Sequence, residues 1–160
     1  TSIEELGAEF KNNYIFRDMI FVPKIGKYNL DDDVVRARIY IKSDWPTKKV
    51  VLIRKKTEWT NEGKTSNISL KKEFDKEQDA LEFIKESLSD FRKEFEYKRE
   101  GWQYELNGCR IFLEDIKGYN PSIEIESNDE NELQNLFKKL GINNFLEESV
   151  PEIMRKVLKN

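Results

Sequence analysis

The chain has 160 residues, 38% of them hydrophobic and 37% charged, and its formal net charge is −3. This length suits one domain with a real core, so we predict a single domain over residues 1–160. The absence of histidine excludes histidine-based catalytic triads and imidazole metal ligands, so any catalysis must use carboxylates, Lys, Arg, Tyr or a hard metal ion. The single cysteine, Cys109, excludes an internal disulfide and a cysteine-rich zinc site.

Composition also bears on location and partners. No apolar run approaches the roughly 20 residues that span a bilayer, and the N-terminus shows no basic-then-apolar signal segment. Together with the single cysteine, these features predict a reducing, cytoplasmic location and no membrane partner. The net negative charge argues against broad electrostatic binding to nucleic acid. A local basic cluster is still compatible with this overall charge.

The first half of the chain alternates as an antiparallel sheet does. Ser2 and Glu5 have the spacing of a capping box, which predicts a short N-terminal helix. Alternating and β-branched segments then predict strands at 14–23, 34–42, 48–59 and 67–74, with turns at 44–47 and 61–64.

The second half mixes helices with further strands. Asp75 is expected to cap a helix with an apolar stripe. The Asn107-Gly108 dipeptide predicts a hairpin between strands at 95–106 and 109–116, and a strand is also expected at 123–127. Two more helices are expected, one after a capping box formed by Ser127 and Glu130 and ending at Gly141, the other from Pro151. About seven antiparallel strands with a few helices predict an α+β fold with a curved sheet or β-barrel.

The polar faces of these strands supply the candidate site. Period-two alternation puts Arg36 and Arg38 on the face opposite the apolar side chains of strand 34–42. If the sheet closes, the cations and carboxylates of other strands could face the same lumen: Lys55, Arg99, Glu73, Glu114, Glu124 and Glu126. Arginine forks bind phosphate oxygens in pairs, and carboxylates hold Mg²⁺ or Mn²⁺. The combination suits a polyphosphate with a divalent metal.

Each feature also has a simpler interpretation. An Arg-x-Arg strand is usually the solvated face of an antiparallel sheet, and alternating glutamates solubilise many strands. The three tryptophans are more often packing residues than base-stacking platforms. Cys109 is a poor candidate nucleophile without a histidine.

The order of these segments resembles the CYTH superfamily, the triphosphate-tunnel proteins that include class IV adenylate cyclases and thiamine or inorganic triphosphatases. VVRAR (34–38) is similar to the family's Leu-Arg-Ile-Arg strand, VLIRK (51–55) to its Leu-Thr-x-Lys strand, and SIEIES (122–127) to its Glu-Ile-Glu strand. LGAEF (6–10) followed by RDMIFVP (17–23), and WQYELNGCRIFLEDIKG (102–118), are similar to two further family segments. The resemblance covers nearly the whole chain and implies an antiparallel β-barrel, the triphosphate tunnel, with flanking α-helices.

The resemblance also implies a site and a cofactor. The triphosphate would be bound by Arg36, Arg38, Lys55 and Arg99, and a metal ion by Glu73, Glu114, Glu124 and Glu126. The ion would be Mg²⁺ or Mn²⁺ if the protein is active. No catalytic residue is assigned.

Several departures from the family pattern bear on activity. The family opens with a Glu-x-Glu-x-Lys strand, whereas this chain begins at the helix after it, and residues 7–11 imitate only two of the three positions. We therefore expect a barrel open at this strand, with an exposed edge to be covered, and a homodimer could complete it. Ser69 and Lys71 stand where glutamates or arginine are expected, Gly101 replaces a cation, and Glu114 replaces the usual Asp.

Two classes of function follow. The leading hypothesis is a protein that binds a triphosphate-containing small molecule and, if active, is a metal-dependent phosphohydrolase. Cyclisation of ATP is the sister activity, distinguished by its product, cyclic AMP with pyrophosphate. The alternative is a catalytically degenerate binding or scaffold protein of the same fold, favoured by the missing strand, Lys71 and Gly101. A third hypothesis is an RNA-end triphosphatase, although no basic cluster outside the predicted tunnel supports a nucleic-acid track.

Overall fold

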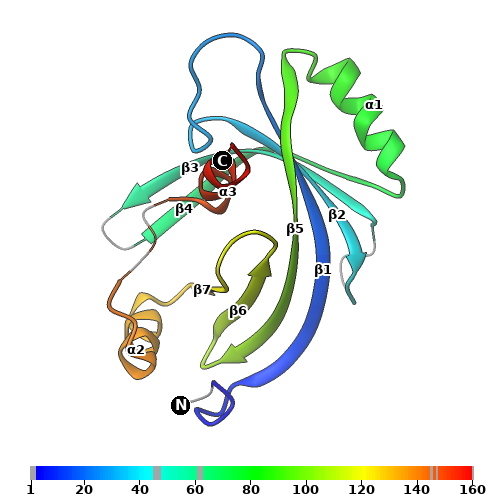
Figure 1. The fold of residues 1–160 in the computed structure, drawn as a ribbon. Helices are drawn as coiled ribbons and strands as arrows, with labels where there is room; N and C mark the ends of the chain where they lie inside the picture. The colour runs from blue at the N-terminus through cyan, green and yellow to red at the C-terminus, as the bar shows by residue number, and fades with distance from the viewer. Residues whose placement is uncertain (1–2, 45–47, 61–62, 145, 147, 160) are drawn as a thin grey trace.

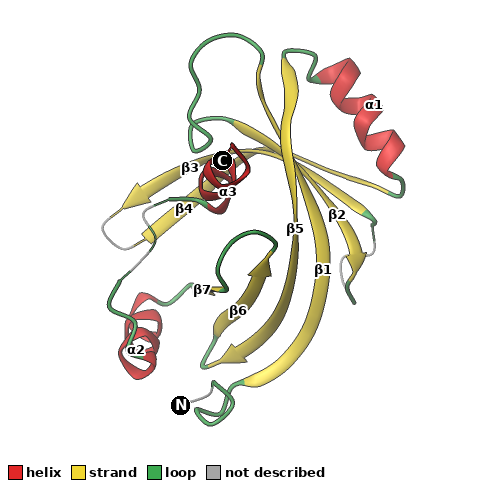
Figure 2. Ribbon diagram, viewed as in Figure 1, coloured by secondary structure: helices red, strands yellow, loops and turns green. Residues whose placement is uncertain are grey.

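The described residues of the computed structural model, 3–44, 48–60, 63–144, 146 and 148–159, form seven strands and three helices. In chain order these are β1 (Glu9–Pro23), β2 (Val34–Lys42), β3 (Val50–Thr60), β4 (Gly63–Phe74), α1 (Glu77–Ser87), β5 (Phe91–Leu106), β6 (Cys109–Ile116), β7 (Ser122–Glu126), α2 (Glu130–Leu140) and α3 (Val150–Lys159). The predicted α+β class with an antiparallel sheet and flanking helices is confirmed (Figure 2).

The strands form one sheet in the order β4-β3-β2-β1-β5-β6-β7, and every neighbouring pair is antiparallel. The sheet curls into a half-barrel, with β4 at one edge and β7 at the other (Figure 1). The two longest strands, β1 and β5, pair along nearly their whole length, and their register shifts twice. Such bulges bend strands and increase their twist, so they help the sheet to curl.

The two faces of the sheet bury different cores. The convex face packs α1 against β1, β2 and β3, with Val35, Ala37 and Ile39 turned toward the helix side. A second convex cluster joins α2, through Leu136, to Ile111 of β6. On the concave face, α3 lies inside the curl, where Met154 and its neighbours meet Ile20, Val22, Leu30, Val34, Tyr97 and Ile116 (Figure 1). The strand alternation thus leaves the Arg36 face of β2 on the concave side.

Turn chemistry explains two predicted boundaries. Asn107 and Gly108 have φ angles of 50° and 76°, which suit the tight hairpin between β5 and β6. Gly141, at a φ of 68°, ends α2 in the left-handed conformation. Both predictions are confirmed.

Four local predictions are wrong. Residues 3–7 form a turn rather than a helix, since so short a segment forms too few hydrogen bonds to offset helix nucleation. Helix α1 begins beyond Asp75, whose carboxylate instead pairs with Lys48 at 2.9 Å. The cap of α2 is Asp129, which accepts from two backbone N–H groups, while Ser127 accepts from the Asp129 N–H. Ser2, residues 45–47 of the predicted turn at 44–47 and residues 61–62 of the predicted turn at 61–64 lie outside the described residues. Gly63 and Lys64 belong to strand β4 and not to a turn.

Among the described helices, none is both long and apolar enough to cross a bilayer.

Candidate functional site

The centre of the concave face is a buried carboxylate, Asp18 of β1, which is 0% exposed. Strand register places it directly opposite Arg38 of β2 and Tyr97 of β5, and residues paired in this way share a face. The same register aligns Ile20 with Arg36, and Phe16 with Arg99. Charged side chains from three strands therefore meet around Asp18.

Asp18 holds two arginines in fixed positions. Arg38 donates from Nε and Nη2 to its two oxygens at 2.8 and 2.9 Å, and Arg99 donates from Nη2 at 2.8 Å. Burial alone would raise the pKa of Asp18, but the charges of Arg38 and Arg99 outweigh it and hold this pKa well below its ordinary value. Asp18 is therefore an ionised anchor. Asp18 was not among the residues predicted for the site, although an acidic residue within an otherwise apolar strand segment could have indicated it.

Arg99 continues the network to β6. Its Nη1 donates to Glu114 Oε2 at 2.9 Å, and the Tyr14 hydroxyl donates to Glu114 Oε1 at 2.7 Å. The side chains of Arg99 and Glu114 are each 5% exposed, so this pair is about as inaccessible as the pair of Arg99 with Asp18. The chain Arg38–Asp18–Arg99–Glu114–Tyr14 thus spans four strands of the sheet.

Gly101 allows this network to form. A Cβ atom at position 101 would lie 2.3 Å from Tyr14 Cζ and 2.4 Å from its hydroxyl oxygen. The Tyr14 ring therefore lies directly over the glycine, where it can reach Glu114. Gly101, which stands where the family pattern has a cation, makes space for the ring of Tyr14. The sequence pattern alone could not show this contact.

Arg36 and Lys55 differ from these paired arginines, because neither forms an ion pair with any described residue. The Arg36 Nε atom is buried without a hydrogen-bond partner. Burial, with the charge of Arg38, lowers the pKa of Arg36 to about 10. Burial, with the charges of Arg36 and Lys64, lowers the pKa of Lys55 from 10.5 to about 7. The negative charges of Asp18, which acts on Arg36, and of Glu124, which acts on Lys55, do not offset burial and the neighbouring cations, so both pKa values stay depressed.

The predicted carboxylates do not gather at one point. Glu124 of β7 lies 3.3 Å from Lys64 of β4, and the charges of Arg99 and Arg38 also lower its pKa, although burial opposes them. Glu126 instead pairs with Arg110 at 2.7 Å, with both side chains exposed. Glu73 lies 3.6 Å from Lys71, also exposed. The structure therefore brings Glu114 and Glu124 toward the cations and leaves Glu73 and Glu126 paired with other residues.

This arrangement does not fit a resident metal ion. Within the described part of the chain, no group of three or more Asp, Glu, Cys or His side chains could hold one. Both oxygens of Glu114 accept hydrogen bonds from Tyr14 and Arg99, and Glu124 is engaged by Lys64. Mg²⁺ requires several well-placed oxygen ligands, which these side chains do not present together.

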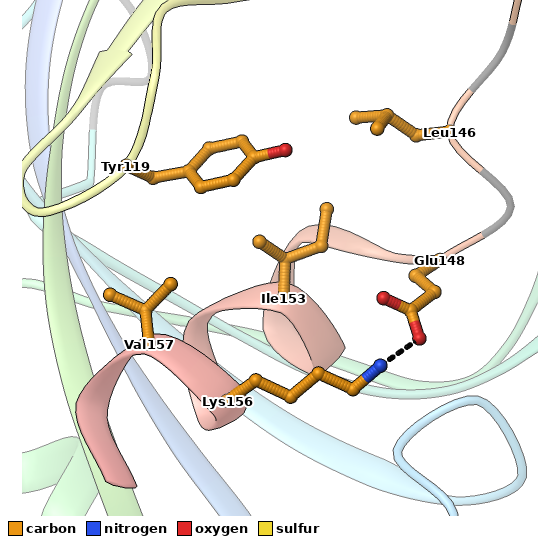
Figure 3. A pocket seen from close by; sticks show the side chains of 6 residues that line it. All are labelled: Tyr119, Leu146, Glu148, Ile153, Lys156 and Val157. Atoms are coloured by element: carbon orange, nitrogen blue, oxygen red, sulfur yellow. Dashed lines mark hydrogen bonds and ion pairs between the residues drawn. The ribbon is translucent and has the colours of Figure 1, made fainter. Parts of the chain in front are cut away.

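A separate hollow lies beside α3. It has a volume of about 270 Å³ and is lined by Tyr119, Leu146, Glu148, Ile153, Lys156 and Val157 (Figure 3). Its charged members, Lys156 and Glu148, pair with each other. It contains none of the concave cations, so it is distinct from the candidate site.

Solved structures share this curled antiparallel sheet with flanking helices, which is the fold that the resemblance to the triphosphate-tunnel, or CYTH-type, proteins implied. The PH1819 protein from Pyrococcus horikoshii OT3 superposes with a TM-score of 0.79 at 19% identity, over 95% of this chain and 89% of that one. The PH1012 protein from the same organism gives a TM-score of 0.66 at 21% identity, over 89% and 82%.

A third structure comes from a plant. It is a putative adenylyl cyclase from Hippeastrum, HpAC1, described as having a dominant triphosphatase activity. Its TM-score is 0.63 at 17% identity, over 92% of this chain and 84% of that one. No protein-family model and no curated protein matches the chain.

Proposed function

We propose that the protein binds a small molecule bearing a polyphosphate group on the concave face of its sheet. The observation that carries this proposal is the pair of cations, Arg36 and Lys55, that have no carboxylate partner among the described residues. A bound anion would offset their desolvation and mutual repulsion, which the protein otherwise bears. The triphosphatase activity described for HpAC1 supports the same class of ligand.

The geometry favours several linked phosphates over one. Arg36 and Arg38 are two residues apart on one strand face, so their Cα atoms lie about 6–7 Å apart. Lys55 lies on the neighbouring strand, β3. An extended chain of phosphates can contact these cations simultaneously, whereas orthophosphate would engage one or two of them.

The side chains have different tasks in such a complex. Arg36 and Lys55 supply positive charge and form no ion pair with a carboxylate of the described residues. Asp18 orients Arg38 and Arg99 through buried hydrogen bonds, so their remaining N–H groups are positioned before the ligand arrives. Positioning of this kind limits the entropy lost on binding.

Hydrolysis of the terminal phosphate is the second candidate function. It is supported by the triphosphatase activity described for HpAC1. Because the described carboxylates do not converge, we place binding before catalysis. Release of orthophosphate from tripolyphosphate would establish hydrolysis, and cyclic AMP with pyrophosphate from ATP would establish cyclisation.

Titration calorimetry with orthophosphate, pyrophosphate and tripolyphosphate in EDTA tests the proposal. We expect one ligand per chain and an affinity that rises with each added phosphate, at about tenfold per additional charged contact. Equal affinities for all three anions, or no binding, would contradict it. Repeating the titration with Mg²⁺ then measures whether the carboxylates contribute.

A further inference from the structure

The two edges of the sheet are joined by an ion pair. Lys64 lies on β4 and Glu124 on β7, which stand at opposite ends of the strand order, yet Lys64 Nζ is 3.3 Å from Glu124 Oε1. The curl of the sheet brings these edges round toward the same side (Figure 1). Among the ion pairs of the described residues, this is the one that joins β4 to β7.

The Lys64–Glu124 pair differs from the buried pairs in its accessibility. Its side chains are 36% and 31% exposed, whereas those of Asp18, Arg99 and Glu114 are 0–5% exposed. A part-exposed ion pair contributes little net stability, so replacing the Glu124 carboxylate with another anion beside Lys64 costs little free energy. Breaking the Asp18 pairs would instead leave buried charges unpaired. The Lys64–Glu124 pair is therefore more readily replaced than the buried pairs of Asp18 with Arg38 and Arg99.

The charges around this pair favour such a replacement. Five cations, Arg36, Arg38, Lys55, Lys64 and Arg99, interact with three carboxylates, Asp18, Glu114 and Glu124. The local excess is therefore two positive charges when Lys55 is protonated. A polyphosphate carries more negative charge than the single carboxylate of Glu124, and it could reach Lys55 as well as Lys64.

Resting on the function proposed above, we propose that Glu124 is an internal anion that occupies the site without ligand, and that Lys64 is an additional phosphate-binding residue. The ligand's phosphate takes the place of the Glu124 carboxylate beside Lys64. Lys64 lies outside the set of cations that the sequence predicted. The proposal also gives Glu124 a role opposite to metal ligation, because here its charge competes with the ligand.

The test compares tripolyphosphate affinities in EDTA for Lys64→Met and Glu124→Gln. We expect Lys64→Met to weaken binding about tenfold, as the loss of one charged contact does, and Glu124→Gln to tighten it by about threefold to tenfold. Lys56→Met and Glu58→Gln are matched controls, since these residues form another exposed pair, 3.5 Å apart, on β3. The controls should stay within about twofold of the original protein, as surface substitutions usually do. Lys64→Arg should retain affinity.

The outcomes separate this inference from the proposed function. Weaker or unchanged binding by Glu124→Gln would overturn the internal-anion role, and unchanged binding by Lys64→Met would overturn the role of Lys64. If the original protein binds tripolyphosphate and Arg36→Met weakens it, while the Lys64 and Glu124 variants match their controls, the proposed function stands and this inference fails. If the original protein does not bind, both fail.

Discussion

The lowered pKa of Lys55 predicts that ligand binding depends on pH. Its pKa is lowered to about 7 because it is buried beside the positive charges of Arg36 and Lys64, with Glu124 as the opposing negative charge. A phosphate bound next to Lys55 would stabilise the ammonium form and raise this pKa. Binding above pH 7 therefore takes up a proton, and affinity should fall as the pH rises.

The size of the effect follows from proton linkage. If the Lys55 pKa is about 7 without ligand and well above 9 with ligand, the affinity changes by the ratio (1 + 10²)/(1 + 10⁻¹) between pH 6 and pH 9. This ratio corresponds to about 90-fold weaker binding at the higher pH, or about 2.7 kcal/mol.

The assay is tripolyphosphate titration of the original protein and Lys55→Arg at several pH values. Arginine stays protonated throughout this range, so the variant should lose this pH dependence. Dividing the two profiles removes the titration of the ligand itself, which is common to both. Parallel profiles would refute the reasoning, because Lys55 would then not titrate on binding.

The lowered pKa of Lys55 also predicts how the free energy of unfolding of the ligand-free protein depends on pH. Between pH 7 and 10.5 the unfolded chain binds the Lys55 proton and the folded chain does not, so the contribution of Lys55 to the free energy of unfolding rises with pH. Its upper limit is about 1.4 kcal/mol per pH unit, and Lys55→Arg should remove it.

Two further predictions concern the fixed network. Gly101→Ala should lower the free energy of unfolding by about 1–3 kcal/mol, since the added methyl group displaces the Tyr14 ring from Glu114; an unchanged urea midpoint would contradict the close approach. Asp18→Asn should cost about 3–5 kcal/mol at neutral pH, because it leaves two buried guanidinium groups without their anion. Since the Asp18 pKa is lowered, this contribution is present above the ordinary value of 3.8 and declines as the pH falls below it, so the variant's deficit should shrink in acid; a deficit that is constant with pH would contradict it.

The sequence predicted which side chains share a strand face better than it predicted which residues they pair with. Alternation within a strand is fixed by backbone geometry, so the shared face of Arg36 and Arg38 could be read directly from their spacing. The partner of Arg38 could not, because it depends on the register between β1 and β2, which places Asp18 opposite it. Arg99 reaches the same carboxylate from 81 residues away.

The carboxylates show the limit of alternation most clearly. Glu124 and Glu126 share a face of β7, yet the first pairs with Lys64 across the open side of the half-barrel and the second with Arg110 on the neighbouring strand. Their contacts depend on how far the sheet curls, which no local pattern encodes. The Lys64 contact arises from this same curl.

The central claim is that Arg36 is an anion-binding residue and not part of a solvated sheet face. Its most direct test is the tripolyphosphate affinity of Arg36→Met beside that of Arg17→Met, which removes an arginine that pairs with Glu77 of α1. We expect Arg36→Met to weaken binding by about 1.5–3 kcal/mol, the scale of a charged hydrogen bond, and Arg17→Met to leave it unchanged. Equal affinities for the two variants and the original protein would contradict the anion-binding role of Arg36.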